Sequence, residues 1–235
     1  MKSIFPQQAI FASPEPAPVC LAPAGASEWQ VGCAHPSAFS WAKRLLDVLG
    51  GLVGLGILLV LVVPVAIAIK LDSPGPVFFA QERRGLLGRS FTMYKFRSMV
   101  VDAEALKAQV HNEAKGLIFK NTRDPRVTRV GRFLRKTSLD EFPQFWNVLK
   151  GEMSLVGTRP PTPDEVANYA PHHWQRLNVK PGITGEWQAH GRSLIQDFED
   201  IVQLDVRYQS RWHPLYDVVL LGKTVANVLL KNDAC

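Results

Sequence analysis

Two adjacent carboxylates, Asp140 and Glu141, are the residues of this 235-residue chain whose types and spacing best suit chemistry. They follow Ser138 in the order Ser-x-x-Glu, a capping-box pattern that predicts a helix from Ser138 to Lys150. The positive end of such a helix would keep an acidic nucleophile ionised and would attract a phosphate group. A helix cap with no further function is the alternative that this local pattern leaves open.

Basic residues stand on both sides of the acidic pair in the sequence. Arg132, Arg135 and Lys136 precede it, and Arg159 follows it, directly before Pro160. The proline restricts the backbone at Arg159, so we expect this guanidinium to be held in place and to bind phosphate through two hydrogen bonds. Two neighbouring carboxylates can also bind Mg²⁺ together with substrate phosphates. Each arginine could instead be a solvated surface charge.

Two further groups are weaker candidates. His172 and His173 could suggest a metal site, but adjacent residues on a helix do not face the same direction. Arg83 and Arg84 could contact a nucleotide or a lipid headgroup, or could be charges at the membrane edge. The sequence contains no P-loop, no dinucleotide-binding glycine fingerprint and no HExxH motif.

The composition limits the class of partner without selecting one. The chain is 46% hydrophobic and carries a formal net charge of +6. This balance suits a folded protein that meets nucleic acid, an anionic lipid surface or a phosphorylated substrate. Its cysteines, Cys20, Cys33 and Cys235, are far apart, which predicts neither a disulfide framework nor a zinc site.

One long apolar segment bears on where the acidic pair lies relative to a membrane. Residues 48–69 are uncharged and long enough to cross a bilayer, but Pro64 interrupts them and predicts a kink. Lys43 and Arg44 precede the segment and Lys70 follows it. The positive-inside rule puts both flanks at the cytoplasmic face, so we predict a re-entrant helix hairpin that bends at Pro64. A single membrane span and a buried soluble helix are the alternatives.

Periodicity and turn residues predict the remaining elements. Two strands, at 77–80 and 91–97, are expected to form a small β-hairpin around a turn at 85–88. Helices are expected at 103–109, 138–150, 165–177 and 198–230. The last of these is amphipathic from residue 212 onward, as an interfacial helix is.

The predicted fold is therefore α+β and mainly helical. It has a re-entrant membrane helix at 41–71 and a catalytic domain at 72–235 on the cytoplasmic face. Residues 1–40 are rich in Ala, Pro, Ser and Gly and have no apolar period, which predicts a disordered tail. This tail lacks the continuous apolar stretch of a signal peptide.

Several short motifs occur in one order from about Trp41 to the C-terminus. They are Lys43-Arg44-x-x-Asp47, SPGPVFF at 73–79, YKFRSM at 94–99, LRKTSLDEFPQ at 134–144, GEMSLVGTRP at 151–160, KPGITG at 180–185, and Gly191-Arg192. In this order they resemble the bacterial sugar transferase family, the monotopic phosphoglycosyl transferases. The resemblance is strongest to the short exopolysaccharide-type members that transfer hexose 1-phosphate to undecaprenyl phosphate.

The resemblance implies a two-step reaction at the bacterial inner membrane, with the active site on the cytoplasmic face. An aspartate attacks the sugar-bearing phosphate of a UDP-hexose, either UDP-glucose or UDP-galactose, and UMP leaves. A polyprenol phosphate then attacks the covalent aspartyl-phosphosugar. The implied partners are UDP-sugar, polyprenol phosphate and membrane lipid, with no nucleic acid; a homodimer is left open.

Carried onto this chain, the resemblance makes Asp140 the nucleophile and Glu141 its acid/base or metal-supporting neighbour, with Mg²⁺ bound at this pair. It implies that Arg159 binds phosphate. The other expected substrate-binding residues are Lys95, Arg97, Arg135 and Pro160, and the expected membrane residues are Lys43, Arg44, Asp47 and Pro64.

Three departures from the family pattern stand out. Val63 precedes the kink proline where many members carry Ser, so the bend is less firmly set here. Glu186 and His190 occupy unusual positions, whereas the intervening Trp187-Gln188 pair resembles hexose-transferring members. The several N-terminal spans of long members are replaced by the predicted tail.

Two other functions are alternatives to the enzyme. A membrane-surface binding or scaffold protein could keep the fold without the activity, but the intact Asp140-Glu141 pair and Arg159 count against it. A basic nucleic-acid binder is disfavoured by the long apolar segment and by the absence of a nucleic-acid-binding motif.

Overall fold

Residues 20–21, 33–190 and 195–230 are described by the computed structural model of the chain. The predicted tail at 1–40 therefore lies mostly outside the described residues, as do Gly191 and Arg192 of the last motif. Where the structure describes the chain, it consists mainly of helices, with three two-stranded sheets. This confirms the mainly helical α+β class.

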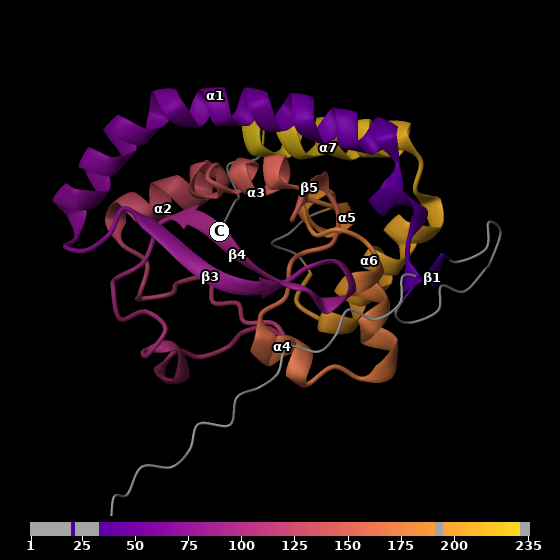
Figure 1. Ribbon diagram of the computed structural model, residues 1–235. Helices are drawn as coiled ribbons and strands as arrows, with labels where there is room; N and C mark the ends of the chain where they lie inside the picture. The colour runs from indigo at the N-terminus through magenta and orange to yellow at the C-terminus, as the bar shows by residue number, and fades with distance from the viewer. Residues whose placement is uncertain (1–19, 22–32, 191–194, 231–235) are drawn as a thin grey trace, which may run out of the picture.

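Helix α1 (Trp41–Asp72) lies across the top of the molecule in Figure 1. It begins where the Ser40 hydroxyl accepts a hydrogen bond from the backbone N–H of Lys43, as an N-cap does. Pro64 lies inside α1, and the helix continues through it and curves down towards α2 (Arg129–Lys136) in Figure 1. By length and composition α1 could cross a membrane. The predicted re-entrant hairpin is not confirmed, because residues 41–72 form one continuous helix.

Two glycines let α1 pack closely on the domain beneath it. A Cβ atom at Gly54 would lie 2.4 Å from the ring of Phe145, and one at Gly51 would lie 2.8 Å from Leu149. Both partners belong to helix α3 (Gln144–Lys150), so larger residues at these glycines would push the two helices apart. Helix α1 is thus fixed to the segment that directly follows the acidic pair.

The predicted β-hairpin is confirmed. Strand β3 (Phe78–Arg84) pairs antiparallel with β4 (Ser90–Phe96), and Ala80 lies opposite Tyr94 in this register. The turn between them contains the short 3₁₀ helix η2 (Leu86–Gly88) and ends on Gly88, whose φ of +77° suits a residue without a side chain. The hairpin lies below α1 and α3 in Figure 1.

The single helix predicted at 138–150 is wrong. The segment forms the 3₁₀ turn η4 (Leu139–Glu141), and α3 starts only at Gln144. Pro143 has no backbone N–H to donate, so the two pieces cannot join as one helix. Ser138 has a left-handed φ of 55° and its side chain makes no capping hydrogen bond, so the expected capping box is also wrong.

Two other predicted helices are shorter than expected. Residues 103–109 form turns and the short 3₁₀ helix η3 (Lys107–Gln109). The stretch at 165–177 divides into α4 (Pro163–Ala167) and the 3₁₀ helix η5 (Pro171–Asn178), because Pro171 ends the hydrogen-bonded run. A capping box does occur in this region, between Thr162 and Glu165 at the start of α4.

A short parallel sheet and the C-terminal helices complete the domain. Strand β5 (Ser154–Val156) pairs with β6 (Gly182–Thr184). The predicted helical stretch at 198–230 is confirmed as α6 (Phe198–Arg211) and α7 (Pro214–Leu230), and α7 lies beside α1 in Figure 1. The smaller elements are β1 (Cys20–Leu21), β2 (Cys33–Ala34), the 3₁₀ helix η1 (Pro36–Phe39) and α5 (Glu186–Ala189).

Apolar side chains remain exposed along the two helices of the upper face. On α1 these are Trp41, Leu45, Leu49, Leu52, Val53, Ile57, Leu59, Val60, Val63, Ile67 and Leu71. On α7 they are Leu215, Val218, Val219, Val225 and Val228. Contiguous exposed apolar surface of this kind marks a protein-interaction or membrane-interaction face.

Candidate active site

Asp140 lies in the 3₁₀ turn η4 and is only 7% exposed. The residues on either side of the acidic pair, Leu139 and Phe142, pack in one apolar cluster with Leu58 and Val65 of α1. The acidic pair is therefore held against the half of α1 that contains Pro64. A three-residue turn supplies little helix dipole, so the expected dipole effect on Asp140 has no basis in the structure.

Lys95 and Glu141 form an ion pair beside Asp140. Nζ of Lys95 lies 3.3 Å from Oε1 of Glu141, and both side chains are less than a quarter exposed. Lys95 comes from strand β4 and Glu141 from η4, so packing of the hairpin against the turn creates the pair. The structure thus brings together two of the residues that the sequence predicted for the site.

Gln144 is a residue of this region that the sequence reasoning did not select. Its side chain is buried, and among the described residues its amide Nε2 has no hydrogen-bond partner. It starts α3, four positions after Asp140. A buried donor left without a protein partner is suited to bind a water or a substrate oxygen.

Arg135 and Arg97 are both tied to the segments around β4. Nε of Arg135 donates to the Ser98 hydroxyl at 2.9 Å. In Arg97, one terminal nitrogen donates to the carbonyl of Pro74 at 2.6 Å and the other to that of Ser73 at 2.7 Å. Arg97 therefore fastens the end of α1 to the hairpin. The predicted substrate role of Arg97 gains no support from this placement.

Arg159 forms a two-pronged ion pair with Glu165. Its terminal nitrogens lie 2.8 and 3.0 Å from the two carboxylate oxygens. Burial favours a higher pKa for Glu165, but the charges of Arg159 and Arg83 outweigh it and hold the pKa below its usual range. The predicted rigidity of Arg159 thus comes from Glu165 on α4 as well as from Pro160.

Arg83 joins this group from strand β3. Its NH1 donates to the carbonyl of Pro160 at 2.8 Å, and its Nε and NH2 donate to the Gln81 side chain. Burial, together with the positive charge of Arg159, lowers the pKa of Arg83 to about 10. The sequence offered Arg83 only as a weak candidate, since nothing local distinguishes it from Arg84.

The N-terminal motif of α1 contacts the domain instead of facing solvent. Arg44 donates to the carbonyls of Val148 and Leu149 at the end of α3. Asp47 is buried and accepts hydrogen bonds, both of 2.8 Å, from the Ser154 hydroxyl and from the backbone N–H of Leu155. These residues were predicted to flank a membrane segment; the structure uses them to dock α1.

Lys43 of the same motif is also buried. Its Nζ lies 2.6 Å from Oδ2 of Asp217, 2.8 Å from the carbonyl of Val156 and 3.1 Å from the hydroxyl of Tyr208. Asp217 belongs to α7, so this ion pair joins the two helices of the apolar upper face. The positive charge that we expected at the membrane surface is instead neutralised inside the domain.

His172 and His173 both reach Glu199, contrary to the expectation that they face apart. Nε2 of His172 lies 3.1 Å from one carboxylate oxygen and Nε2 of His173 lies 2.7 Å from the other. Nδ1 of His173 accepts the backbone N–H of Ala170, which leaves the ring proton on Nε2. That proton is donated to Glu199, so the hydrogen bonds from both histidines to Glu199 join η5 to α6.

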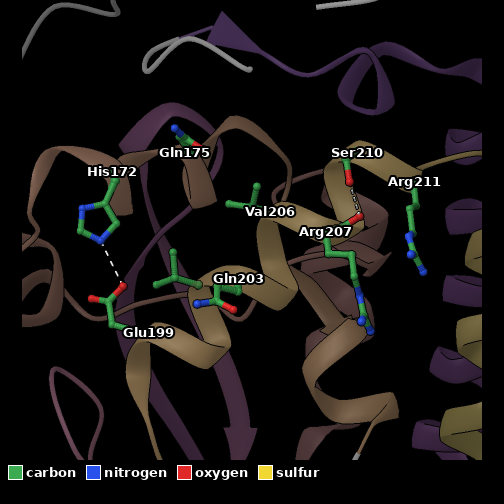
Figure 2. Close-up of a pocket in the computed structure, with 9 residues that line it drawn as sticks. His172, Gln175, Glu199, Gln203, Val206, Arg207, Ser210 and Arg211 are labelled. Atoms are coloured by element: carbon green, nitrogen blue, oxygen red, sulfur yellow. Dashed lines mark hydrogen bonds and ion pairs between the residues drawn. The ribbon is translucent and has the colours of Figure 1, made fainter. Parts of the chain in front are cut away.

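Figure 2 shows the surface hollow beside the hydrogen bond from His172 to Glu199. Arg207 and Arg211 lie on the other side of this hollow. Its volume is about 560 Å³. Arg207 is already paired with the buried Glu186, at 2.6 Å. Of the candidate residues from the sequence, only the weaker candidate His172 lines this hollow.

Asp140 and Glu141 carry oxygen ligands of the kind that the magnesium ion implied by the resemblance would need. Asp140 and Glu141 present carboxylates from consecutive positions of one turn. Mg²⁺ prefers oxygen ligands and usually takes one or two carboxylates plus substrate phosphates. Nζ of Lys95 lies 3.3 Å from Oε1 of Glu141, so an ion held by Glu141 would share this carboxylate with the ammonium.

Comparison with known proteins matches most of the chain. A family model described as bacterial sugar transferase covers residues 38–231. The galactosyl transferase CpsE of Streptococcus agalactiae is 52% identical over 198 residues, which make up 82% of this chain and 43% of CpsE. The UDP-glucose:undecaprenyl-phosphate glucose-1-phosphate transferase of Xanthomonas campestris is 39% identical over 213 residues, 87% of this chain and 42% of that protein.

A shorter relative matches along nearly its whole length. The uncharacterized sugar transferase EpsL of Bacillus subtilis is 39% identical over 190 residues, 81% of this chain and 88% of EpsL. By contrast, the chain spans about two fifths of the length of CpsE and of the Xanthomonas enzyme. The acidic pair and the arginines described above all lie in the matched region.

Proposed function

The chain belongs to the bacterial sugar transferase family, and from this premise we propose that it transfers hexose 1-phosphate from a UDP-hexose to undecaprenyl phosphate. The relatives named above are a galactosyl transferase and a glucose-1-phosphate transferase, which supports galactose or glucose as the hexose. The product would be the first lipid-linked intermediate of an exopolysaccharide or related glycan.

The observation that carries this proposal is the position of the acidic pair. Asp140 is buried against the apolar helix α1 through its neighbours Leu139 and Phe142, and Glu141 faces the ammonium of Lys95. A lipid phosphate held at a membrane surface could reach such a site, while its polyprenyl chain stays with the exposed apolar side chains of α1. The site thus combines a carboxylate nucleophile with access to a lipid substrate.

The chemistry proceeds in two displacements at one phosphorus. The Asp140 carboxylate attacks the phosphorus that carries the hexose, the bond to the UMP oxygen breaks, and UMP leaves with the bonding electrons. A phosphate oxygen of undecaprenyl phosphate then attacks the same phosphorus and releases Asp140 unchanged. The covalent intermediate divides one difficult transfer between two bulky substrates into two easier steps.

The other residues hold charge in place during these steps. Lys95 holds Glu141 in place beside the nucleophile, and Arg159 neutralises charge that builds on the transferred phosphate. Mg²⁺ held by Asp140 and Glu141 would supply further neutralisation of the diphosphate.

The proposal places the enzyme at the cytoplasmic face of the bacterial inner membrane. UDP-sugars carry several charges and need an aqueous site, whereas α1 and α7, which lie side by side in Figure 1, both expose apolar side chains. A helix that enters and leaves the same leaflet must bend, and Pro64 inside α1 is a residue type at which helices bend. Both ends of α1 would then lie in the cytoplasm.

Substrate turnover tests the reaction. Purified enzyme is incubated with undecaprenyl phosphate and a panel of UDP-sugars, and UMP release and the lipid product are measured. We expect one UDP-hexose to give both products, Asp140→Asn to give neither, and the exposed control Asp200→Asn to match wild type. Undiminished turnover by Asp140→Asn would show that the covalent mechanism is wrong.

A labelling experiment tests the topology. Single cysteines placed before Trp41 and after Asp72 are treated with a thiol reagent that cannot cross the membrane, in spheroplasts and in inverted vesicles. A re-entrant α1 exposes both cysteines only in inverted vesicles. Labelling of the first cysteine in intact spheroplasts would establish a single span instead.

A further inference from the structure

Helix α2 presents one exposed face that combines positive charge with a large aromatic ring. Its exposed residues recur at positions i, i+3, i+4 and i+7, which lie on one side of a helix. They are Arg129, Arg132, Phe133 and Lys136. The opposite side packs inward through Gly131 and Leu134, which are both buried. We call the exposed side the basic face of α2.

The cations of the basic face have no ion pair or side-chain hydrogen bond with another residue that the structure describes. Arg135, on the inward side of the same helix, donates to the Ser98 hydroxyl instead. Asp72 acts on Arg129 and Arg132 through space, but its carboxylate already accepts the backbone N–H of Val130. The basic face therefore keeps a net positive charge that an external anion could neutralise.

The basic face lies beside the end of the long apolar helix. The N–H of Val130 donates to Oδ2 of Asp72 at 2.8 Å, which ties the start of α2 to the end of α1. Leu134 packs in one apolar cluster with Val65 and Ile69 of α1. Close to this junction α1 exposes Leu71, which is 84% exposed. The exposed cations of α2 thus adjoin exposed apolar surface of α1.

This combination matches the surface of a bilayer that contains anionic lipid. Phe133 is 59% exposed, and rings of this kind on an amphipathic helix are buried among acyl chains while the basic residues meet the headgroups. The negative potential of an anionic leaflet attracts Lys and Arg side chains. An apolar protein partner would leave the cations unpaired, and a nucleic acid would leave Leu71 and its neighbours on α1 in water.

The chain between the basic face and the acidic pair is short and hydrogen-bonded. The backbone N–H and the hydroxyl of Thr137 both donate to the carbonyl of Phe133, at 3.0 and 2.8 Å. The N–H of Ser138 donates to the carbonyl of Arg135, and the carbonyl of Ser138 accepts the N–H of Glu141. Docking of α2 on a surface would therefore also position the turn η4 relative to that surface.

We propose that the basic face of α2 binds the anionic phospholipid headgroups of the bilayer and so sets the distance of the acidic pair from the membrane surface. The inference uses the membrane location given in the proposed function and adds a requirement for lipid charge. It does not depend on the transfer reaction.

Lysine acetylation of the full chain in lipid nanodiscs tests the proposal. The nanodiscs contain either phosphatidylcholine alone or phosphatidylcholine with phosphatidylglycerol, and acetic anhydride labelling of each lysine is measured by mass spectrometry. We expect phosphatidylglycerol to slow labelling of Lys136 roughly fivefold, the factor that one basic residue contributes at an anionic surface. The exposed Lys115, which lies outside α2, is the reference and should react equally in both lipids.

Salt and paired variants test whether charge on this face is responsible. About 0.5 M NaCl should restore much of the labelling of Lys136, because salt screens exposed charges. Replacing both arginines, by Arg129→Gln and Arg132→Gln, keeps Lys136 as the reporter and should remove most of its protection. The matched control, Arg89→Gln with Arg123→Gln, removes two exposed cations elsewhere and should keep the protection.

The aromatic ring is tested separately. Phe133→Ser should reduce the protection of Lys136 in phosphatidylglycerol, because the helix loses the apolar group that enters the acyl region. All of these side chains are exposed, so the variants should fold as wild type does.

The outcomes separate this inference from the proposed function. Equal labelling of Lys136 in the two lipids overturns the inference, and so does equal loss of protection in the two double variants. Protection by a single-stranded RNA in detergent, without protection by phosphatidylglycerol, would also overturn it and assign the face to nucleic acid. None of these measurements uses turnover, so the transferase proposal stands or falls by its own assay.

Discussion

Nζ of Lys95 lies 3.3 Å from Oε1 of Glu141, although the two residues are 46 positions apart in the chain. Strand β4 and the turn η4 meet at this contact, directly beside the buried Asp140. Because both partners are partly exposed, the pair adds little to stability, on the order of 1 kcal/mol or less. Its value lies in fixing the Glu141 carboxylate next to Asp140, the proposed nucleophile.

Removing either partner should therefore slow transfer without unfolding the protein. We expect Lys95→Met and Glu141→Gln each to lower kcat roughly tenfold to hundredfold, with the midpoint of urea unfolding nearly unchanged. The double variant should lose no more than the worse single variant, because both act through one contact. Multiplied losses in the double variant, measured by UMP release, would show that the two residues act separately.

The covalent intermediate should be directly observable. With UDP-hexose present and undecaprenyl phosphate omitted, intact mass spectrometry should find a fraction of the enzyme heavier by one hexose phosphate. Asp140→Asn should carry no adduct, and addition of undecaprenyl phosphate should remove it from the wild type. An adduct that persists in Asp140→Asn would move the nucleophile to another residue.

The Arg159–Glu165 pair should make stability depend on acid pH. The pKa of Glu165 is lowered in the folded protein, so the pair stabilises above about pH 4.3, the ordinary carboxyl value, and this stabilisation is lost as pH falls through the lowered pKa. Glu165→Gln should cost about 1–3 kcal/mol at pH 7 and less at pH 3, by urea unfolding. An equal cost at both pH values would contradict an ionic role.

The buried Lys43–Asp217 pair should tolerate removal of both charges better than removal of one. Asp217→Asn leaves Lys43 buried without its counter-ion and should cost about 3–5 kcal/mol of unfolding free energy. Replacing both, by Lys43→Met and Asp217→Leu, should recover much of that loss. A double variant less stable than Asp217→Asn would indicate that these residues act through other contacts, such as the Tyr208 hydroxyl.

His35 should destabilise the fold as pH falls below neutrality. Burial lowers its pKa to about 4, against an unfolded value of about 6.5, so the unfolded chain binds the proton first. Stability is full above pH 6.5 and should decline by about 1–2 kcal/mol by pH 5. His35→Asn should remove this part of the pH dependence between pH 5 and 8, by thermal unfolding; an unchanged slope would assign it to other groups.

Local sequence signals predicted the elements that depend on short-range chemistry. The hairpin of β3 and β4 and the helices α6 and α7 were placed correctly, because alternation, turn residues and helical spacing act over a few residues. The helix expected from Ser138 failed because two local signals conflicted. Its capping pattern favoured one helix, while Pro143 prevented it, and the proline prevailed.

The pairings at the site depend on long-range packing and could not be read from spacing. Glu165, which holds Arg159, was expected only as part of a helix, and Arg83 was not distinguished from Arg84. Lys43 and Asp47 carry charges that usually indicate a surface, yet they are buried by partners more than a hundred positions away. A charged residue's environment is set by what folds against it, which no local pattern encodes.

The sequence by itself determined the family, through the order of its motifs, and the identity of the acidic pair, through the adjacency of Asp140 and Glu141. It also determined one long apolar helix, because hydropathy is a property of composition. Only the tertiary structure decided that Lys95 faces Glu141, that Arg83 joins Arg159, and that the motif at Lys43 docks α1 on the domain. These outcomes come from contacts between segments distant in sequence, whose geometry exists only once the core has formed.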